Sequence, residues 1–227
     1  FINSSKDDGR RSKNRSDRND PTRKQLIQLY ELYEKRCEQA GVVDFAELLL
    51  RSFELLRDVQ ELGDYYRDRF RHLLVDEFQD TNGIQYDWLK QLVGKGGAPF
   101  VVGDDDQSIY RWRGARVENM QHFRREFGAA VYRLQQNYRS TAVILAAANA
   151  VITKNTDRMG KELWTATEGG DPIRVYAAFN ERDEADFVIE RIREHARGGQ
   201  PLAGAAVLYR SNAQSRSFEE ALVSARI

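Results

Sequence analysis

Residues 73–80 of this 227-residue chain read LLVDEFQD. Three apolar residues followed at once by acids predict a short buried strand that ends at the edge of a sheet. Ligands of open α/β sheets bind beyond the carboxyl ends of the strands, which is where Asp76 and Glu77 are expected. Two adjacent carboxylates suit nucleotide hydrolysis, because one can hold Mg²⁺ through water while its neighbour deprotonates the attacking water. A strand that merely ends in a solvated acidic turn has the same pattern, so both interpretations stay open.

Short β-rich runs alternate with helical patterns from this string onward. The expected strands are residues 73–75, 100–102, 131–134, 173–177 and 205–209. The expected helices are residues 84–92, 117–127, 141–154, 184–196 and 215–224, and the stretch 160–171 is expected to be a loop. Strands that alternate with helices predict an α/β fold in which a parallel sheet is joined by crossover helices.

The first seventy or so residues lack this alternation and predict helices only. Residues 25–40 place apolar side chains three and four apart, and a glycine follows. Asp44 is the expected N-cap of a second helix at 45–56, with Glu47 completing a capping box, and a third helical stretch follows around residues 65–70. Residues 4–24 are polar and charged without an apolar period, which predicts a mobile loop.

The second expected strand ends in residues 103–115, GDDDQSIYRWRGA. Gln107 offers an uncharged amide that can contact phosphate without fixing a metal ion. Tyr110, Trp112 and Arg113 then interleave aromatic and cationic groups. Aromatic faces stack on bases while arginines hold the phosphate backbone, which is how single strands are bound without sequence preference. The aromatic residues could equally be ordinary packing residues, although their place after a polar strand end favours binding.

The third expected strand leads into residues 135–140, QQNYRS. Arg139 in this position could reach across a cleft and stabilise charge on a transferring phosphoryl group. An arginine at the start of a helix can also cap that helix or form a salt bridge, so the string alone leaves both roles open.

Taken together, these strings resemble the superfamily-one DNA helicases of the UvrD-like group. The resemblance rests on residues 75–82 (VDEFQDTN), 103–115 and 136–140 (QNYRS). Residues 43–49 (VDFAELL) and 208–216 (LYRSNAQSR) support it, so that it covers nearly the whole chain. Coincidence is a poor explanation, because each of the three main motifs follows a predicted strand, as its chemistry requires.

The resemblance implies a role for each matching residue and implies ATP and Mg²⁺ as cofactors. Asp76 would be the magnesium-site carboxylate, and Glu77 would be the base that acts on water. Gln107 would sense the γ-phosphate, Tyr138 would stack on the adenine, and Arg139 would contact the γ-phosphate from a second motor domain. The residues implied to contact DNA are Tyr110, Trp112, Arg113, Phe45 and Asn212.

The fold implied is α/β, with RecA-like parallel sheets of the P-loop NTPase type and an N-terminal helical segment. Residues 1–70 would be the end of a helical insertion subdomain. Residues 71–136 would be the second part of the first RecA-like motor domain, and residues 137–227 the first part of the second.

The activity implied for the whole protein is ATP-dependent 3′-to-5′ translocation along single-stranded DNA, with duplex unwinding in repair or replication. Its partners would be single-stranded DNA and single-strand/duplex junctions, with DNA repair proteins as further candidates. One alternative is the helicase subunit of a helicase–nuclease complex, whose motifs overlap. Another is a binding module that docks DNA or a protein partner without turnover.

The phosphate-cradling motif G-x-x-x-x-G-K-[ST] does not occur in the chain. Gly-Lys pairs occur at 94–95 and 160–161, but neither is followed by Ser or Thr, and both are expected to be surface turns. The motifs that come later in the family are also missing. The sequence therefore predicts that this segment alone hydrolyses ATP negligibly, and both of its ends look like cuts through a longer protein.

Composition narrows the class of protein without deciding it. Apolar residues make up 41% and charged residues 31%, which suits a globular protein rather than a disordered one. No apolar run approaches the roughly 20 residues of a membrane helix, so no membrane partner is expected. Lys plus Arg equal Asp plus Glu at 35 each, so any attraction to nucleic acid must be local.

Cys37 is the single cysteine of the sequence. One cysteine excludes an internal disulfide and a cysteine-cluster metal site, and it fits a reducing compartment. With the helicase resemblance, this predicts a cytoplasmic, nucleoid-associated bacterial protein.

Overall fold

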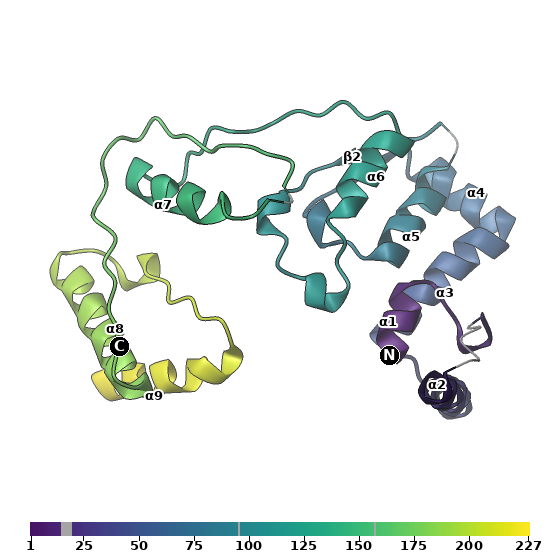
Figure 1. Ribbon diagram of the computed structural model, residues 1–227, viewed down its shortest axis with the longest axis horizontal. Coiled ribbons are helices and arrows are strands. Elements are labelled where there is room, and N and C mark those ends of the chain that lie inside the picture. The colour runs from purple at the N-terminus through teal and green to yellow at the C-terminus, as the bar shows by residue number, and fades with distance from the viewer. Residues whose placement is uncertain (15–19, 95, 157) are drawn as a thin grey trace. The chain divides into compact units, whose positions relative to one another are not determined.

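A computed structural model describes residues 1–14, 20–94, 96–156 and 158–227. These residues form two compact units, Phe1–Glu168 and Gly169–Ile227, and each is described by itself. Figure 1 traces the chain through both, coloured from the N-terminus to the C-terminus. Within the described ranges, no helix combines the length and the apolar character that crossing a bilayer takes.

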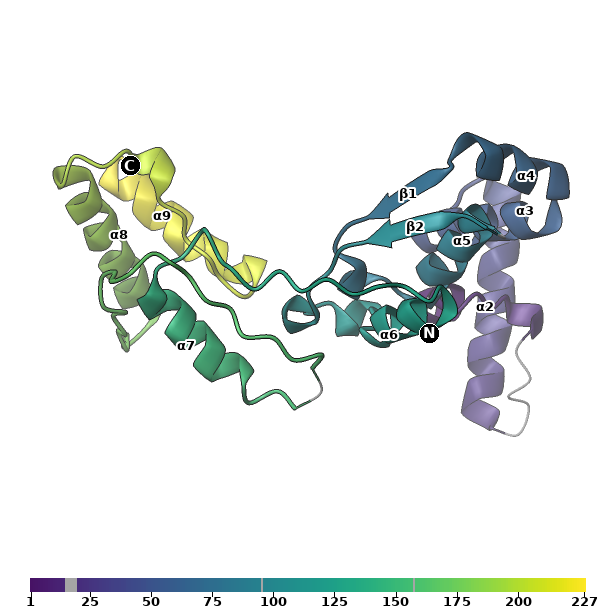
Figure 2. The same ribbon diagram turned by 90° about the horizontal axis from the view of Figure 1, so that it is seen from above.

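A two-stranded parallel sheet lies in the first unit. Strand β1 (His72–Val75) pairs with β2 (Ala98–Val101), with Leu74 opposite Phe100 and Val75 opposite Val101. Helix α5 (Gly83–Val93) connects them, as a parallel pair requires, and Figure 2 shows the two arrows side by side. The strands predicted at 73–75 and 100–102 are confirmed with shifts of one or two residues. Their carboxyl ends therefore meet at one edge of the sheet.

Phe78, the residue directly after the two acids, anchors the acidic turn in the hydrophobic core. Its ring lies 5.4 Å from that of Phe123 and 6.0 Å from that of Tyr86, measured between ring centroids. Phe123 belongs to α6 (Glu118–Glu126) and Tyr86 to α5, and Leu89 and Val93 complete the buried cluster. Because one side chain of the turn is held in the core, the flanking acids are presented from a rigid support.

The three helices that the sequence predicted before the sheet are present: α2 (Pro21–Ala40), α3 (Phe45–Asp58) and α4 (Gln60–Arg69). Gly41 ends α2 in the left-handed conformation with φ of 64°, which glycine adopts without strain. The Asp44 side chain accepts a hydrogen bond from the Glu47 backbone nitrogen at 2.6 Å, so the expected N-cap is confirmed. Cys37 is a free, half-buried thiol on α2.

The loop predicted for residues 4–24 is wrong for the part of it that the structure describes, while residues 15–19 lie outside the described residues. Helix α1 (Ile2–Asp7) and a 3₁₀ turn (Ser12–Asn14) occupy this stretch, and α2 already begins at Pro21. Two of the cations in this stretch, Lys6 and Arg11, are folded inward rather than solvated, because carboxylates from later helices neutralise them. A local count of charges cannot reveal such partners.

Lys6 and Arg11 are the centres of this ion-pair network. The side chain of Lys6 is 2% exposed, and its Nζ lies 2.8 Å from Asp44 Oδ2 and 3.0 Å from Glu47 Oε2. Arg11 donates from Nη1 to Glu47 Oε1 at 2.7 Å, and it also pairs with Glu54. Burial alone would raise the pKa of Asp44 and of Glu47, but the cationic partners outweigh burial and lower both. The two carboxylates therefore stabilise the fold at neutral pH, and this stability is lost as pH falls through their lowered pKa values.

Replacing Lys6 by methionine is expected to destabilise α1 and α3 by about 3 kcal/mol, because it removes the buried cation shared by the half-buried Asp44 and the buried Glu47. Hydrogen exchange at the backbone amides of these helices measures the local opening free energy. The matched control is Lys35→Met on the exposed face of α2, where a change within about 0.5 kcal/mol is expected. Equal protection of both variants would contradict the structural role of the network.

Three further helices confirm the sequence pattern: α7 (Ala142–Ile152) in the first unit, and α8 (Glu181–Arg197) and α9 (Ser215–Ala225) in the second. Ala185 and Ile189 of α8 and Phe218 of α9 are buried. The stretch 160–171 is loop, as predicted, apart from an isolated bridge between Gln136 and Trp164.

The strands predicted at 131–134, 173–177 and 205–209 are wrong. None of these segments pairs with a strand among the described residues, and apolar side chains such as Leu134, Val175 and Leu208 are exposed. A β-rich segment becomes a strand only where a second strand supplies its backbone hydrogen bonds. The part of the chain that the structure describes is therefore helix-dominated with a small parallel sheet, and this arrangement is consistent with the RecA-like fold that the resemblance implies.

Candidate functional site

Asp76 and Glu77 occupy the turn that follows β1, and both carboxylates are exposed. Glu77 has φ of 49°, a left-handed conformation that a residue with a Cβ rarely adopts. The backbone nitrogen of Glu77 donates to Asp76 Oδ1 at 2.9 Å, which stabilises this geometry. Strained backbone of this kind is typical of functional turns, because the surrounding structure must hold it in place.

The turn after β2 is hydrogen-bonded to the turn after β1. Val102 donates from its backbone nitrogen to the Val75 carbonyl at 2.8 Å, and Phe78 donates to the Val102 carbonyl at 2.9 Å. Beyond these bonds, the Asp104 backbone nitrogen donates to Gln79 Oε1 at 2.9 Å. The structure thus brings the acidic pair and the segment that begins at Gly103 to the same edge of the sheet.

Gln107 lies at the end of a 3₁₀ turn (Asp105–Gln107), with its side chain exposed. Its Nε2 donates to Asp104 Oδ2 at 2.8 Å, so the amide is tied to the start of its own turn. Gln107 therefore lies in the same hydrogen-bonded assembly as the acidic turn.

The acid triplet Asp104–Asp106 brings ligand atoms within 4.8 Å of one another, which is close enough for a metal ion. Its carboxylates, however, already have cationic or N–H partners. Arg158 binds Asp106 with two hydrogen bonds of 2.9 and 2.6 Å, Lys161 pairs with Asp104, and the Met159 backbone nitrogen donates to Asp105. Burial raises the pKa of Asp104, but the hydrogen bonds from Lys161 and Gln107 outweigh burial and lower it. The triplet is an ion-pair cluster that anchors the loop 158–161.

Tyr110, Trp112 and Arg113 form an exposed cluster on the continuation of the same segment. The guanidinium carbon of Arg113 lies 5.0 Å from the ring centroid of Tyr110 and 4.7 Å from that of Trp112. Trp112 is 69% exposed. Gly114 then reverses the chain with φ of 90°. An aromatic pair that holds a cation and faces solvent provides a surface on which bases can stack.

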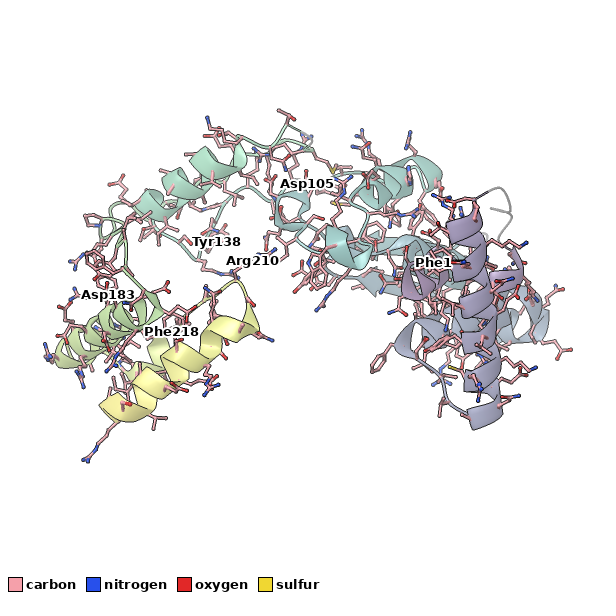
Figure 3. The ribbon with its side chains drawn as sticks, turned by 60° about the horizontal axis from the view of Figure 1, so that its bottom comes forward. Phe1, Asp105, Tyr138, Asp183, Arg210 and Phe218 are labelled. Carbon is pink, nitrogen blue, oxygen red and sulfur yellow. The ribbon has the colours of Figure 1, made fainter. Side chains whose placement is uncertain are left out.

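Tyr138 and Arg139 are exposed in the turn before α7, and Figure 3 labels Tyr138. Asn137 Oδ1 accepts hydrogen bonds from the backbone nitrogens of Arg139 and Ser140, at 2.9 and 2.7 Å, which fixes the backbone of the turn. Among the described residues, no carboxylate pairs with the guanidinium of Arg139. The salt-bridge interpretation of this arginine therefore has no support, and the side chain is free to meet a ligand.

Phe45 and Asn212, the other two predicted DNA contacts, are not brought to the acidic turn by any described interaction. Phe45 is the first residue of α3 and is 92% exposed. Asn212 is exposed in a 3₁₀ turn (Asn212–Gln214) of the second unit. Their exposure is compatible with binding and does not by itself identify a partner.

Comparison with known families places both parts of the chain. The model of the UvrD/REP helicase N-terminal domain matches residues 1–128, and that of the UvrD-like helicase C-terminal domain matches residues 132–227. The chain belongs to the UvrD/REP helicase family. The two family models confirm the resemblance that the sequence motifs indicated.

Individual relatives agree with the family models. DNA helicase II of Haemophilus influenzae is 53% identical over 227 residues, which is 100% of the chain and 31% of that protein. DNA helicase II of Escherichia coli is 53% identical over 99% of the chain and 31% of that protein. ATP-dependent DNA helicase PcrA of Staphylococcus epidermidis is 43% identical over 92% of the chain and 29% of that protein. The UvrD/REP chain thus spans about a third of the length of the curated relatives it matches.

Sequence reasoning on this UvrD/REP chain missed Gln79, Arg158 and Lys161. Gln79 is buried between the two post-strand turns, and the two cations pair with acids more than fifty residues earlier. No local pattern distinguishes a buried glutamine in an acidic turn from a solvated one. Lys161 belongs to a Gly-Lys pair that was expected to be a plain surface turn, while Lys95 of the other pair lies outside the described residues.

Proposed function

We propose that the chain is a segment of an ATP-dependent DNA helicase that couples ATP hydrolysis to movement along single-stranded DNA in the 3′-to-5′ direction and to duplex unwinding. The observation that carries this proposal is the joining of two turns by hydrogen bonds at one sheet edge. One turn presents Asp76 and Glu77, and the other runs through Gln107 into the exposed cluster of Tyr110, Trp112 and Arg113. The DNA helicase names of the relatives support the same activity.

On the nucleotide side, Asp76 is the residue proposed to hold Mg²⁺. Its carboxylate is exposed, and within the described ranges it has no cationic partner, unlike Asp104 and Asp106 of the triplet. Carboxylate oxygen is the ligand that Mg²⁺ prefers, so the residue fits the ion. Mg²⁺, when bound, would neutralise charge on the phosphate oxygens.

Glu77 is proposed to take a proton from water as that water attacks the γ-phosphorus of ATP. A bond then forms from the water oxygen to phosphorus, the bond from phosphorus to the β–γ bridging oxygen breaks, and ADP leaves with that electron pair. Gln107 would contact the γ-phosphate, and Tyr138 would stack on the adenine. The exposed guanidinium of Arg139 would stabilise charge on the transferring group.

On the DNA side, Tyr110, Trp112 and Arg113 are proposed to bind bases and phosphates of a single strand, with Phe45 and Asn212 as additional contacts. Because the Gln107 turn and this cluster are consecutive in sequence, a shift of the turn on ATP binding moves the cluster directly. Single-stranded DNA and single-strand/duplex junctions are the proposed substrates, with repair or replication as the setting and repair proteins as further partners.

The domain assignment is part of this proposal. Residues 1–70 would be the end of a helical insertion subdomain. Residues 71–136 would be the second part of the first RecA-like motor domain, and residues 137–227 would be the first part of the second. The segments 131–134, 173–177 and 205–209, which are extended and unpaired here, would enter sheets completed by other parts of a longer protein. The proposed location is the bacterial cytoplasm, in association with the nucleoid.

Replacing Trp112 by alanine in the full-length protein is expected to weaken binding of a single-stranded oligonucleotide about 5- to 150-fold, because base stacking contributes about 1–3 kcal/mol. Fluorescence anisotropy of a labelled oligonucleotide measures the change in Kd. The matched control is Tyr65→Ala, an exposed aromatic residue on α4, which should leave Kd unchanged. Equal affinities of the Trp112 and Tyr65 variants for the oligonucleotide would show that this cluster does not bind single-stranded DNA. A wild-type protein that binds DNA but shows no DNA-stimulated ATP hydrolysis would instead be a binding module.

A further inference from the structure

Gln79 is a polar residue buried in the middle of the candidate site, with 1% of its surface exposed. Both ends of its amide have partners. Nε2 donates to Glu77 Oε2 at 2.7 Å, and Oε1 accepts from the Asp104 backbone nitrogen at 2.9 Å. The orientation of the amide is dictated by chemistry, because an ionised carboxylate can only accept and a backbone N–H can only donate. No other side chain among those described joins the two turns in this way.

The backbone around Gln79 is shaped to let this contact form. A Cβ added to Gly103 would lie 2.9 Å from Gln79 Oε1 and 3.3 Å from the backbone nitrogens of Gln79 and Phe78. Glycine at position 103 therefore leaves room for the Gln79 amide. It is not needed there for a left-handed φ. The turn after β2 packs directly onto the amide, so neither turn can shift without disturbing it.

The contact extends in both directions to residues of the proposed chemistry. On one side, Glu77 is held with φ of 49° and its Oε2 is engaged by Gln79, which leaves Oε1 for a water molecule. On the other side, Asp104 accepts from Gln107 Nε2 at 2.8 Å and from the Asp106 backbone nitrogen at 3.0 Å. A continuous path of hydrogen bonds thus runs from Glu77 through Gln79 and Asp104 to Gln107.

We propose that Gln79 is a positioning residue that holds Glu77 and the Gln107 turn in one hydrogen-bonded unit, so that the base is aligned only when that turn is in place. The proposal rests on the proposed function, since it concerns the base and the phosphate sensor of that reaction. Gln79 does not touch substrate. It acts by donating to one oxygen of Glu77, which fixes the orientation of the carboxylate and leaves the other oxygen for water.

The test uses Gln79→Glu in the full-length protein with Mg²⁺, ATP and a single-stranded oligonucleotide. Glutamate keeps the shape and the acceptor but replaces the donor with a second carboxylate facing Glu77. The single-turnover rate of ATP cleavage is expected to fall at least about 30-fold, which is part of the roughly 10²- to 10⁴-fold that a positioned general base contributes. KM for ATP and nucleotide-free DNA affinity should stay within about threefold of wild type, since neither contact involves Gln79.

The matched control is Gln28→Glu on the exposed face of α2, which should leave both the cleavage rate and KM for ATP unchanged. A merely structural glutamine would lower the amount of folded protein, but the cleavage rate per ATP-binding site of the surviving enzyme would stay at its wild-type value. A Gln79→Glu variant whose cleavage rate per ATP-binding site lies within threefold of wild type therefore overturns the proposal.

Gly103→Ala tests the same contact from the opposite turn and serves also where Gln79→Glu does not fold. Its cleavage rate should fall while KM for ATP is retained, and a folded variant with a rate within threefold of wild type overturns the proposal. Glu77→Gln is measured in parallel. Loss of cleavage in Glu77→Gln with a normal cleavage rate in Gln79→Glu rejects only the role of Gln79, whereas full activity of Glu77→Gln rejects the proposed function itself.

Discussion

Replacing Arg139 by alanine in the full-length protein is expected to lower kcat for DNA-stimulated ATP hydrolysis by about 10³-fold or more. An arginine that stabilises charge on a transferring phosphoryl group contributes about 10³ to 10⁵ in rate. The structure supports this role for two reasons. The guanidinium is exposed and has no carboxylate partner among the described residues, and the Asn137 side chain fixes the backbone that carries it. Steady-state phosphate release at saturating DNA measures the effect.

Tyr138→Ala is the matched control for Arg139, because the two residues are adjacent and both exposed but have different proposed roles. Loss of a ring that stacks on adenine should raise KM for ATP and leave kcat nearly unchanged. The Arg139 variant should show the opposite pattern, with nucleotide-free DNA affinity intact in both. If kcat of Arg139→Ala stays within about tenfold of wild type, the arginine does not stabilise charge on the transferring phosphoryl group.

Glu77→Gln is expected to lower the same kcat by about 10²- to 10⁴-fold, the range in which a positioned general base contributes. Glutamine preserves the size of the side chain and its contact with Gln79, so the loss isolates proton acceptance. Binding of ATP and of single-stranded DNA should persist, since neither depends on removing a proton from water. Rapid-quench measurement of ATP cleavage separates this chemical step from product release.

Asp80 provides a control carboxylate in the same turn. Burial, and then the nearby charge of Glu77, raise the pKa of Asp80 above its ordinary value. Asp80→Asn should retain cleavage within about tenfold of wild type, because the Gln79 amide engages Glu77 and not Asp80. Reversed results for the two variants would transfer the base role from Glu77 to Asp80.

The two turns explain why a short stretch of sequence can link ATP and DNA. Gln107 and Trp112 are five residues apart, and the segment between them is tied at its start to the acidic turn through Asp104 and Gln79. The loop 158–161 contributes the cationic partners of this segment, because Lys161 pairs with Asp104 and Arg158 pairs with Asp106. A displacement of this loop would therefore act on the Gln107 turn through ion pairs rather than through the sheet.

The sequence by itself determined the elements whose signals are local. Helices α2 to α9 were recognisable because apolar periodicity, an N-cap such as Asp44 and stop signals such as Gly41 act within a few residues. The two strands that precede the acidic and the Gly103 turns were recognisable for the same reason. The order of these motifs was sufficient to indicate the helicase family, which the family models then established.

Only the tertiary structure decided which distant groups meet. It buried Lys6 against Asp44 and Glu47, placed the amide of Gln79 between two turns, and paired Arg158 with Asp106. It also left three β-rich segments unpaired, because strand formation depends on a partner that the segment itself does not contain. The physical reason is common to all these cases. The free energy of burying a charge, an amide or a strand depends on groups that lie far away along the chain. The local sequence does not predict which groups these are.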